Sequence, residues 1–211
     1  MASVICISHL TGSGGDEVGR RLADRLGFLY VNEEIVAHAA TAGGLEPREV
    51  ADEEKRKSLA ARIIDLLAAG GGDMVAGAGA PAYVSDRPGA AEVRALIRET
   101  IEQTAARGRV VISAHAAAHA LAGRSDVLSV LVTASPANRA GRLREEHQLD
   151  DAEADRQIRR EDAGRRDYLK RFYDVDAELP THYDLVINTD SLTVDDAVAI
   201  VAHAAGASRS D

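Results

Sequence analysis

Aromatic side chains are scarce in this chain. Phenylalanine, tyrosine and tryptophan make up 3% of its 211 residues, and tryptophan is absent. Proteins that bind single-stranded nucleic acid stack its bases on such rings. The chain also carries a net charge of −9, whereas nucleic-acid backbones are bound by lysine and arginine. These two features argue against a nucleic-acid-binding protein.

Cysteine and lysine are nearly absent as well. Cys6 is the only cysteine, so the chain has no pair of cysteines for an internal disulfide or a thiolate-rich metal site. Its place in an apolar run predicts a small buried core residue. Lysine occurs only at positions 55, 57 and 170, and the other 22 of the 25 basic residues are arginine. Positive charge in this protein is therefore mostly arginine charge.

Long apolar runs are missing. No stretch approaches the roughly 20 apolar residues that a membrane-spanning helix needs. The first residues also lack the basic segment followed by an apolar one that marks a secretory leader. We therefore expect a cytoplasmic protein without a membrane partner. Its length suits a single α/β domain with a small inserted lobe.

Short apolar runs alternate with segments of helical periodicity along the chain. The runs that predict buried strands are 4–7, 28–31, 110–113, 127–133 and 183–188. Strands separated by helices predict a three-layer α/β/α fold, in which a doubly wound five-stranded parallel sheet lies between helices. We expect one domain over residues 1–206, followed by a frayed tail at 207–211.

Two helical regions interrupt this alternation. Residues 32–107 are expected to form a helical insertion with helices at about 32–44, 47–69 and 90–106. Its segment 70–88 is rich in glycine and proline, which suits either a mobile lid over a ligand or a connection without a role. Residues 136–173 are expected to form two arginine-rich helices, and a closing helix is expected from about residue 193 to 204.

The first twenty residues carry the clearest motif. An apolar strand, a glycine-rich turn and an amphipathic helix follow one another, as in a phosphate-binding loop, where backbone N–H groups and the helix N-terminus attract an anion. In the pattern G-x-x-x-x-G-K-[ST], His9 takes the first glycine, Gly14 the second, Gly15 the lysine and Asp16 the hydroxyl residue. The turn is thus interpreted either as a phosphate site or as a plain strand-to-helix connection. The candidate nucleotide-binding residues are Thr11, Gly12, Ser13, Gly14, Gly15 and Asp16.

Arginines gather after the fourth predicted strand. In an acidic protein this concentration favours binding of a polyphosphate, because one guanidinium can hold two oxygens. The alternative is a solvated helix with ion pairs four residues apart, for which Glu161–Arg165 and Asp162–Arg166 have the spacing. The basic residues of this segment are Arg139, Arg142, Arg144, Arg156, Arg159, Arg160, Arg165, Arg166, Lys170 and Arg171.

Histidines give no comparable signal. His115 and His119 lie four residues apart, but no H-E-x-x-H pattern or third ligand accompanies them. We therefore predict no metal-binding residues. The sequence G-x-S-x-G, which would mark a serine nucleophile, is also missing.

Several segments, in this order and spacing, resemble the cytidylate-kinase-like family, a branch of the P-loop nucleoside monophosphate kinases. The first three are the opening Ile5-Cys-Ile-Ser8, Gly12-Ser-Gly-Gly15 and Leu22-Ala-Asp-Arg-Leu-Gly27. The later ones are Tyr30-Val-Asn-Glu-Glu-Ile35, Asp126-Val-Leu-Ser-Val-Leu-Val132, Arg139 with Arg142, the pattern Asp162-x-x-Arg165-Arg166-x-Tyr168, and Tyr183-Asp-Leu-Val-Ile-Asn-Thr189. The resemblance covers nearly the whole chain.

The resemblance implies a P-loop NTPase-like fold with a small helical insertion that closes over an acceptor nucleotide. It also implies phosphoryl transfer from ATP, with Mg²⁺ bridging the phosphates, to a nucleoside monophosphate such as CMP or to a similar small acceptor. On this model residues 12–15 cradle the donor phosphates, the arginines at 139, 142, 165 and 166 neutralise charge during transfer, and Asp162 orients one of them. The expected partner is a nucleotide or another small phosphorylated ligand.

Three positions depart from the family pattern and support a second hypothesis. The family commonly has a basic residue at Asp16, G-R-G at Ser113-Ala-His115 and Asp-Lys at Asn32-Glu33. Each change removes positive charge, or a close backbone approach, where phosphate is expected. The alternative is therefore a non-catalytic nucleotide-binding or regulatory protein that keeps the fold. A third hypothesis is an interaction module whose alanine-rich helices form a homodimer.

Overall fold

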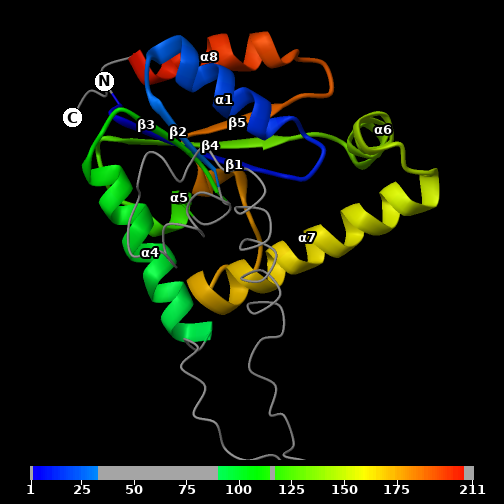
Figure 1. Cartoon of the computed structure of the whole chain (residues 1–211), viewed down its shortest axis with the longest axis horizontal. Coiled ribbons are helices and arrows are strands. Elements are labelled where there is room, and N and C mark those ends of the chain that lie inside the picture. Colours follow the sequence, from blue (N-terminus) through cyan, green and yellow to red (C-terminus); the bar gives the residue numbers. More distant parts are fainter. Residues whose placement is uncertain (1, 33–89, 115–116, 207–211) are drawn as a thin grey trace, which may run out of the picture. The chain divides into compact units, whose positions relative to one another are not determined.

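The computed structural model describes residues 2–32, 90–114 and 117–206 (Figure 1). The predicted helices at 32–44 and 47–69, the segment 70–88 and the tail 207–211 lie outside these residues or almost wholly outside them.

The chain divides into two compact units. The first contains residues 1–33 and 101–211, and the second contains residues 34–100. The glycine-rich loop and the arginine-rich helices both belong to the first unit. The sheet and the candidate site can therefore be described within that unit.

A five-stranded parallel sheet forms the centre of the first unit, with the strand order β2-β3-β1-β4-β5. Its strands are β1 Val4–His9, β2 Leu29–Asn32, β3 Val110–Ser113, β4 Val127–Thr133 and β5 Leu185–Asn188. The predicted five-stranded parallel sheet is confirmed. β1 runs two residues beyond its predicted end because its pairing with β4 continues to His9 opposite Val132. Polar residues at a strand end keep this backbone pairing, which an apolar pattern cannot reveal.

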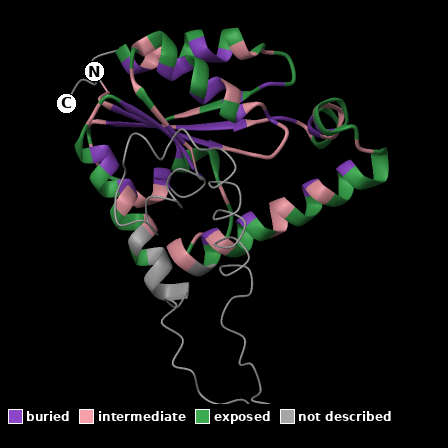
Figure 2. Cartoon of the chain, viewed as in Figure 1, coloured by how far each residue is buried: buried purple, intermediate pink, exposed green. Residues whose placement is uncertain are grey.

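The central position of β1 explains its unbroken apolar run. It pairs with β3 on one side and β4 on the other, and residues 4–7 are fully buried. A parallel strand that is covered on both faces has no solvent side on which polar residues could alternate. Figure 2 shows the resulting buried band across the middle of the sheet.

Helices cover both faces of the sheet (Figure 1). On one face, α1 (Gly15–Leu26) and α8 (Val194–Gly206) lie side by side. On the other lie α5 (Ala117–Ala120) and the C-terminal part of α7 (Asp151–Tyr173). The remaining helices are α4 (Ala90–Ala106), α6 (Pro136–His147) and the 3₁₀ turn η1 (Pro180–His182). The sequence did not predict α5 or η1, because three or four residues are too few to show a helical period.

Local signals set the ends of these helices. Ser135 caps α6, since its hydroxyl accepts from Asn138 N at 3.4 Å, and Pro136 takes the first position. A capping box between Asp150 and Glu153 starts α7. These caps set the starting points of α6, which follows β4, and of α7, which follows α6.

No helix in the described ranges combines the length and apolar character that a membrane crossing requires.

The packing of α1 on the sheet gives a first prediction. Leu22 is fully buried in the cluster that joins α1, α8 and the sheet. Leu22→Ala should lower the free energy of unfolding by about 2–5 kcal/mol, through lost burial and a residual cavity. Ile200→Ala on α8, where the side chain is 39% exposed, should cost about 1 kcal/mol or less. Urea denaturation of both variants measures the difference, and equal losses would contradict this packing.

Candidate functional site

The candidate site is the loop between β1 and α1, at the carboxyl end of the central strand. Open parallel sheets bind their ligands at this end. Gly12 and Gly14 both adopt left-handed backbone conformations, with φ of 77° and 79°. A Cβ on Gly12 would lie 2.7 Å from the carbonyl oxygen of Arg139, so the loop backbone touches the backbone of α6 directly. Glycine is required at this contact for its size as well as for its φ.

Every carbonyl group from residue 9 to residue 14 accepts a hydrogen bond from the protein. Three of the donors are arginine side chains: Arg165 Nη1 to His9 O at 3.3 Å, Arg139 Nε to Thr11 O at 2.6 Å and Arg142 Nη1 to Gly12 O at 3.2 Å. The other three contacts are Ser13 N to Leu10 O at 2.9 Å, Thr189 Oγ1 to Ser13 O at 2.8 Å and Val18 N to Gly14 O at 3.1 Å.

These hydrogen bonds determine which backbone groups of the loop can face a ligand. The loop carbonyls, which would repel an anion, are held by protein donors. The first N–H groups of α1 have no acceptor within the helix, and Gly14 supplies no side-chain cap. Free N–H groups at a helix N-terminus form an anion-binding site. The loop therefore has the donor arrangement that a phosphate group requires.

Arg139 is buried at the contact between the loop, α6 and α7. Its Nη1 and Nη2 donate to the two carboxylate oxygens of Asp162 at 3.0 and 2.7 Å, while its Nε holds Thr11 O. The guanidinium is 3% exposed and the carboxylate 26%. The structure thus brings the predicted residues Arg139 and Asp162 together as a bidentate pair that supports the loop.

Arg142, one turn further along α6, joins the loop to the end of β5. Its Nη1 donates to Gly12 O and to Thr189 Oγ1, the latter at 2.9 Å, and its Nη2 donates to Thr189 O at 2.6 Å. Thr189 is buried and its hydroxyl also holds Ser13 O. Sequence reasoning included Thr189 in the last segment that resembles the family but assigned it no role.

Arg165 is buried beneath the loop rather than exposed on α7. Its Nε donates to Glu178 Oε2 at 2.8 Å and its Nη2 to Ser8 Oγ at 2.7 Å. Tyr183 OH donates to the same Glu178 carboxylate. Burial raises the pKa of Tyr183 to about 12, with the carboxylate contributing. Burial alone would raise the pKa of Glu178, but the hydrogen bond and charge of Arg165 outweigh it, so this pKa lies below its usual range.

The charged residues of α7 divide into two groups: Asp155 and Arg159 form an exposed pair with the predicted spacing, whereas Asp162 and Arg165 pair with residues outside the helix. Arg165 pairs with Glu178, and Glu161 accepts hydrogen bonds from Thr11 Oγ1 and Gln157. The solvated-helix interpretation is wrong for Arg165, because the spacing of charges along one helix does not reveal acceptors contributed by the loop and by other segments.

Arg166 differs from the other three predicted arginines. It is exposed, and in the part of the chain that the structure describes it has no hydrogen bond or ion pair. It lies four residues after Asp162, so both residues project from the same side of α7. Arg166 is therefore the member of the predicted set whose guanidinium is available to a ligand.

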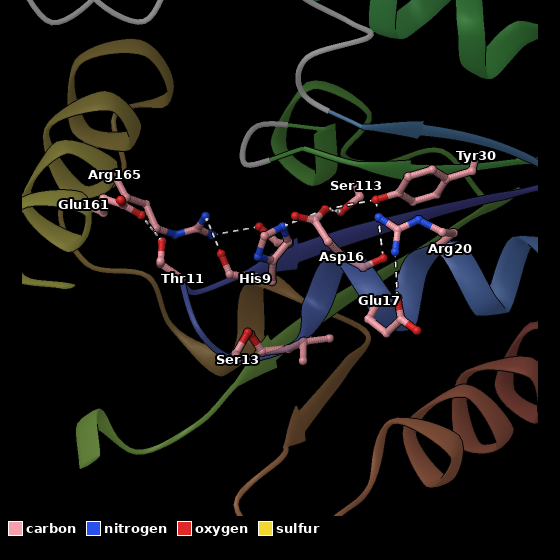
Figure 3. A network of polar contacts seen from close by, with 12 residues as sticks. His9, Thr11, Ser13, Asp16, Glu17, Arg20, Tyr30, Ser113, Glu161 and Arg165 are labelled. Atoms are coloured by element: carbon pink, nitrogen blue, oxygen red, sulfur yellow. Dashed lines mark hydrogen bonds and ion pairs between the residues drawn. The ribbon is translucent and has the colours of Figure 1, made fainter. Parts of the chain in front are cut away.

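A second polar cluster surrounds Asp16 at the start of α1 (Figure 3). Its Oδ1 accepts from Ser113 Oγ at 2.8 Å and from Tyr30 OH at 3.0 Å, and it lies 3.3 Å from His9 Nε2. Ser113 and His9 are the last residues of β3 and β1, and Tyr30 lies within β2. Gly19 permits the arrangement, because a Cβ there would lie 2.9 Å from the Tyr30 ring.

The cluster keeps Asp16 ionised. Partial burial alone would raise the pKa of its carboxyl, but the hydrogen bond and charge of His9, with the hydrogen bonds from Ser113 and Tyr30, hold it well below its usual range. Burial and the Asp16 carboxylate raise the pKa of Tyr30, so its hydroxyl remains a donor. Sequence reasoning identified Asp16 but gave no roles to its three partners, which are far apart in the chain.

The position that lysine occupies in the common P-loop pattern is closed to a side chain. A Cβ on Gly15 would lie 2.2 Å from the Cβ of His9. His9 thus fills the space beside the loop from which a lysine would reach a phosphate. Any positive charge that acts on a bound phosphate must come from elsewhere.

Metal ligands are not clustered here. Among the described residues, no group of three or more histidine, cysteine, aspartate or glutamate side chains could hold a metal ion. A metal ion at the loop would therefore need ligands from a bound nucleotide.

His119, one of the two histidines spaced four residues apart, packs near the rings of Tyr173 and Tyr183, with ring centroids 5.5 and 6.1 Å away. Burial lowers the pKa of His119.

Comparison with solved structures defines the class of fold. Similar chains are an uncharacterized protein from Eubacterium ventriosum (TM-score 0.66, 16% identity, 96% of this chain and 97% of that one), shikimate kinase from Bacteroides thetaiotaomicron (0.53, 16%, 95% and 96%) and shikimate kinase from Acinetobacter baumannii in complex with shikimate (0.50, 12%, 95% and 91%). With the strand order and the glycine loop, these likenesses show a P-loop kinase-like fold.

The family follows from the sequence of the whole domain. The model of the cytidylate kinase-like family matches residues 4–191. The chain belongs to this family. No curated protein matches it.

The Arg139–Asp162 pair gives a prediction about stability. Asp162→Ala leaves the buried guanidinium without its counter-ion, which should lower the free energy of unfolding by about 3 kcal/mol or more. Asp155→Ala is the matched control on the same helix, because its ion pair with Arg159 is exposed and is worth about 1 kcal/mol at most. Chemical denaturation measures both values. Similar small losses in the two variants would show that the pair does not support the fold.

Glu178 gives a prediction about pH. Because its pKa is lower in the folded than in the unfolded state, ionised Glu178 stabilises the fold above its ordinary pKa of 4.5. This stabilisation is lost as the pH falls through the folded-state value. The stability difference between the wild type and Glu178→Gln should therefore shrink below about pH 4. Denaturation curves measured across this range test it, and a constant difference would contradict it.

Proposed function

We propose that this protein is an ATP-dependent phosphotransferase whose acceptor is a nucleoside monophosphate such as CMP, or a similar small molecule. The observation that carries the proposal is the complete engagement of the loop carbonyls from residue 9 to residue 14. It leaves the N–H groups at the start of α1 as the donors that face a phosphate. Membership of the cytidylate kinase-like family supports the same conclusion.

The chemistry asks little of the protein beyond position and charge. In phosphoryl transfer the attacking and leaving oxygens must lie roughly in line, and negative charge on the transferred group must be neutralised. In this proposal the N–H groups of residues 14–16 bind the donor phosphates. The loop is preorganised for that role, because its carbonyls do not have to turn away when the phosphates arrive.

The predicted arginines divide into two roles. Arg139, Arg142 and Arg165 direct their guanidinium groups to loop carbonyls and to protein side chains, and we assign them to hold the loop. Arg166 is exposed on the same side of α7 as Asp162, and we assign it to neutralise charge on the transferred group. This assignment retains one of the four arginines in the role that the sequence predicted.

Such a reaction uses Mg²⁺, which would neutralise negative charge on the donor phosphates. Its preferred ligands are carboxylate, hydroxyl and water oxygens. Asp16 and Ser113 supply one carboxylate and one hydroxyl beside the loop, in contact with each other. The donor set therefore suits a hard cation that takes its remaining ligands from phosphate and water.

A non-catalytic nucleotide-binding protein is the second candidate function. It is favoured by the contact of His9 with Gly15, which leaves no room for a lysine at the loop, and by the engagement of three arginines in structural contacts. On this hypothesis the loop still binds nucleotide phosphates, but no phosphoryl group is transferred.

Binding and turnover separate these functions. We expect Mg-ATP, and more strongly Mg-ATP with CMP, to raise the melting temperature, since a ligand at 100 times its Kd adds about 2.7 kcal/mol. Arg166→Ala should lower kcat by about 100-fold or more and leave the melting temperature unchanged. Arg159→Ala, exposed on the same helix, is the control. Release of ADP in the presence of acceptor measures turnover.

The possible results have distinct meanings. Nucleotide binding without ADP release would favour the non-catalytic function. Turnover that Arg166→Ala leaves intact would contradict the role given to Arg166. If no nucleotide at millimolar concentration shifts the melting temperature of the wild type, the proposed function is wrong.

A further inference from the structure

The two oxygens of the Asp16 carboxylate have different surroundings. Ser113, Tyr30 and His9 all approach Oδ1 (Figure 3). Oδ2 has no hydrogen-bond or ion-pair partner among the described residues, and the side chain is 53% exposed. Three groups from three strands thus fix the orientation of a carboxylate whose second oxygen is open to a ligand.

The partner on β3 makes this arrangement informative. P-loop enzymes of the common type hold Mg²⁺ with a serine or threonine hydroxyl at the end of the glycine loop and an aspartate carboxylate on a strand. In this chain the loop position carries Asp16 and the end of β3 carries Ser113. Their side chains are hydrogen-bonded at 2.8 Å. The same two functional groups are present, with their positions exchanged.

We propose that Asp16 Oδ2 and Ser113 Oγ form the protein side of a site for the divalent cation of a metal–nucleotide complex, in an exchanged version of the usual carboxylate–hydroxyl pair. The inference rests on the proposed function and extends it to the cation. Tyr30 and His9 are positioning residues, because they hold Oδ1 and leave Oδ2 to the cation.

The hydroxyl of Ser113 can serve both partners. It donates its proton to Asp16 Oδ1, and its lone pairs remain for a metal ion. Mg²⁺ keeps several waters and binds through one or two protein ligands when phosphates supply the rest. One carboxylate and one hydroxyl are too few to hold a free ion tightly. The site therefore takes the cation together with the nucleotide.

The exchange also accounts for a negative charge beside a phosphate site. Without a cation, Asp16 repels the triphosphate, and Gly15 provides no lysine to offset that repulsion. With Mg²⁺ bound to the phosphates, the same carboxylate attracts the complex. Metal dependence of nucleotide affinity is therefore the property that this arrangement controls.

Isothermal titration calorimetry with ATP tests the proposal without an activity assay. Wild-type protein should bind ATP about tenfold or more tightly in Mg²⁺ than in EDTA, as expected for unit charges a few ångströms apart. Asp16→Asn keeps the shape of the side chain and should abolish this difference, mainly by tightening binding in EDTA. Glu17→Gln is the matched control, since the neighbouring Glu17 pairs with Arg20 and Arg21 on the exposed side of α1.

A reciprocal exchange makes the test independent of any one variant. Asp16→Ser should lose the dependence on Mg²⁺, and the double variant Asp16→Ser/Ser113→Asp, with unchanged net charge, should regain it. Thermal unfolding establishes that each variant is folded.

The outcomes separate this inference from the function on which it rests. Equal affinities in Mg²⁺ and EDTA for the wild type overturn the metal site and leave nucleotide binding intact. A folded Asp16→Asn variant that retains the full difference also overturns it. Absence of ATP binding under both conditions overturns the proposed function, and the metal site with it.

Discussion

The fixing of the loop carbonyls is the interaction on which the rest of the site depends. A glycine-rich backbone has high conformational entropy, and its carbonyls can turn toward a ligand as readily as its N–H groups. Here each carbonyl from residue 9 to residue 14 meets a donor, and three of the donors are guanidinium groups from α6 and α7. Four of the six carbonyls are thus oriented by side chains distant in sequence, while the glycines supply the backbone freedom and, at Gly12, the space that the loop needs.

Internal carboxylates complete this arrangement. A buried arginine needs a paired acceptor, and Asp162 and Glu178 provide one for Arg139 and Arg165. An acidic chain can thus concentrate arginine around the glycine loop without a strong local excess of positive charge. Three of the predicted arginines are engaged with protein acceptors in this way and do not face a ligand. The proposed chemistry therefore depends on the exposed Arg166 and on a divalent ion.

Much of the fold could be predicted from sequence, because a buried parallel strand has a continuous apolar run and the longer helices have a periodic one. The glycine loop and Asp16 were recognisable for the same reason, since their signal is contiguous. The partners of the loop were not. Thr189, Ser113 and Glu178 lie at or after the ends of elements at separate places in the chain, and no local pattern assigns them a contact with the loop or with Asp16. The arginines were identified as a cluster, but spacing along one helix cannot tell a buried clamp from an exposed ligand-binding group.

The close approach of Gly12 to the backbone of Arg139 has a consequence for communication within the molecule. Backbone lies against backbone with no side chain between them, so a displacement of the loop would be transmitted directly to the first turn of α6. Free-energy coupling is reciprocal: if phosphate binding orders α6, then whatever orders α6 raises phosphate affinity by the same factor. The helix that follows β4 is in this sense a second element through which the affinity of the proposed nucleotide site could be changed.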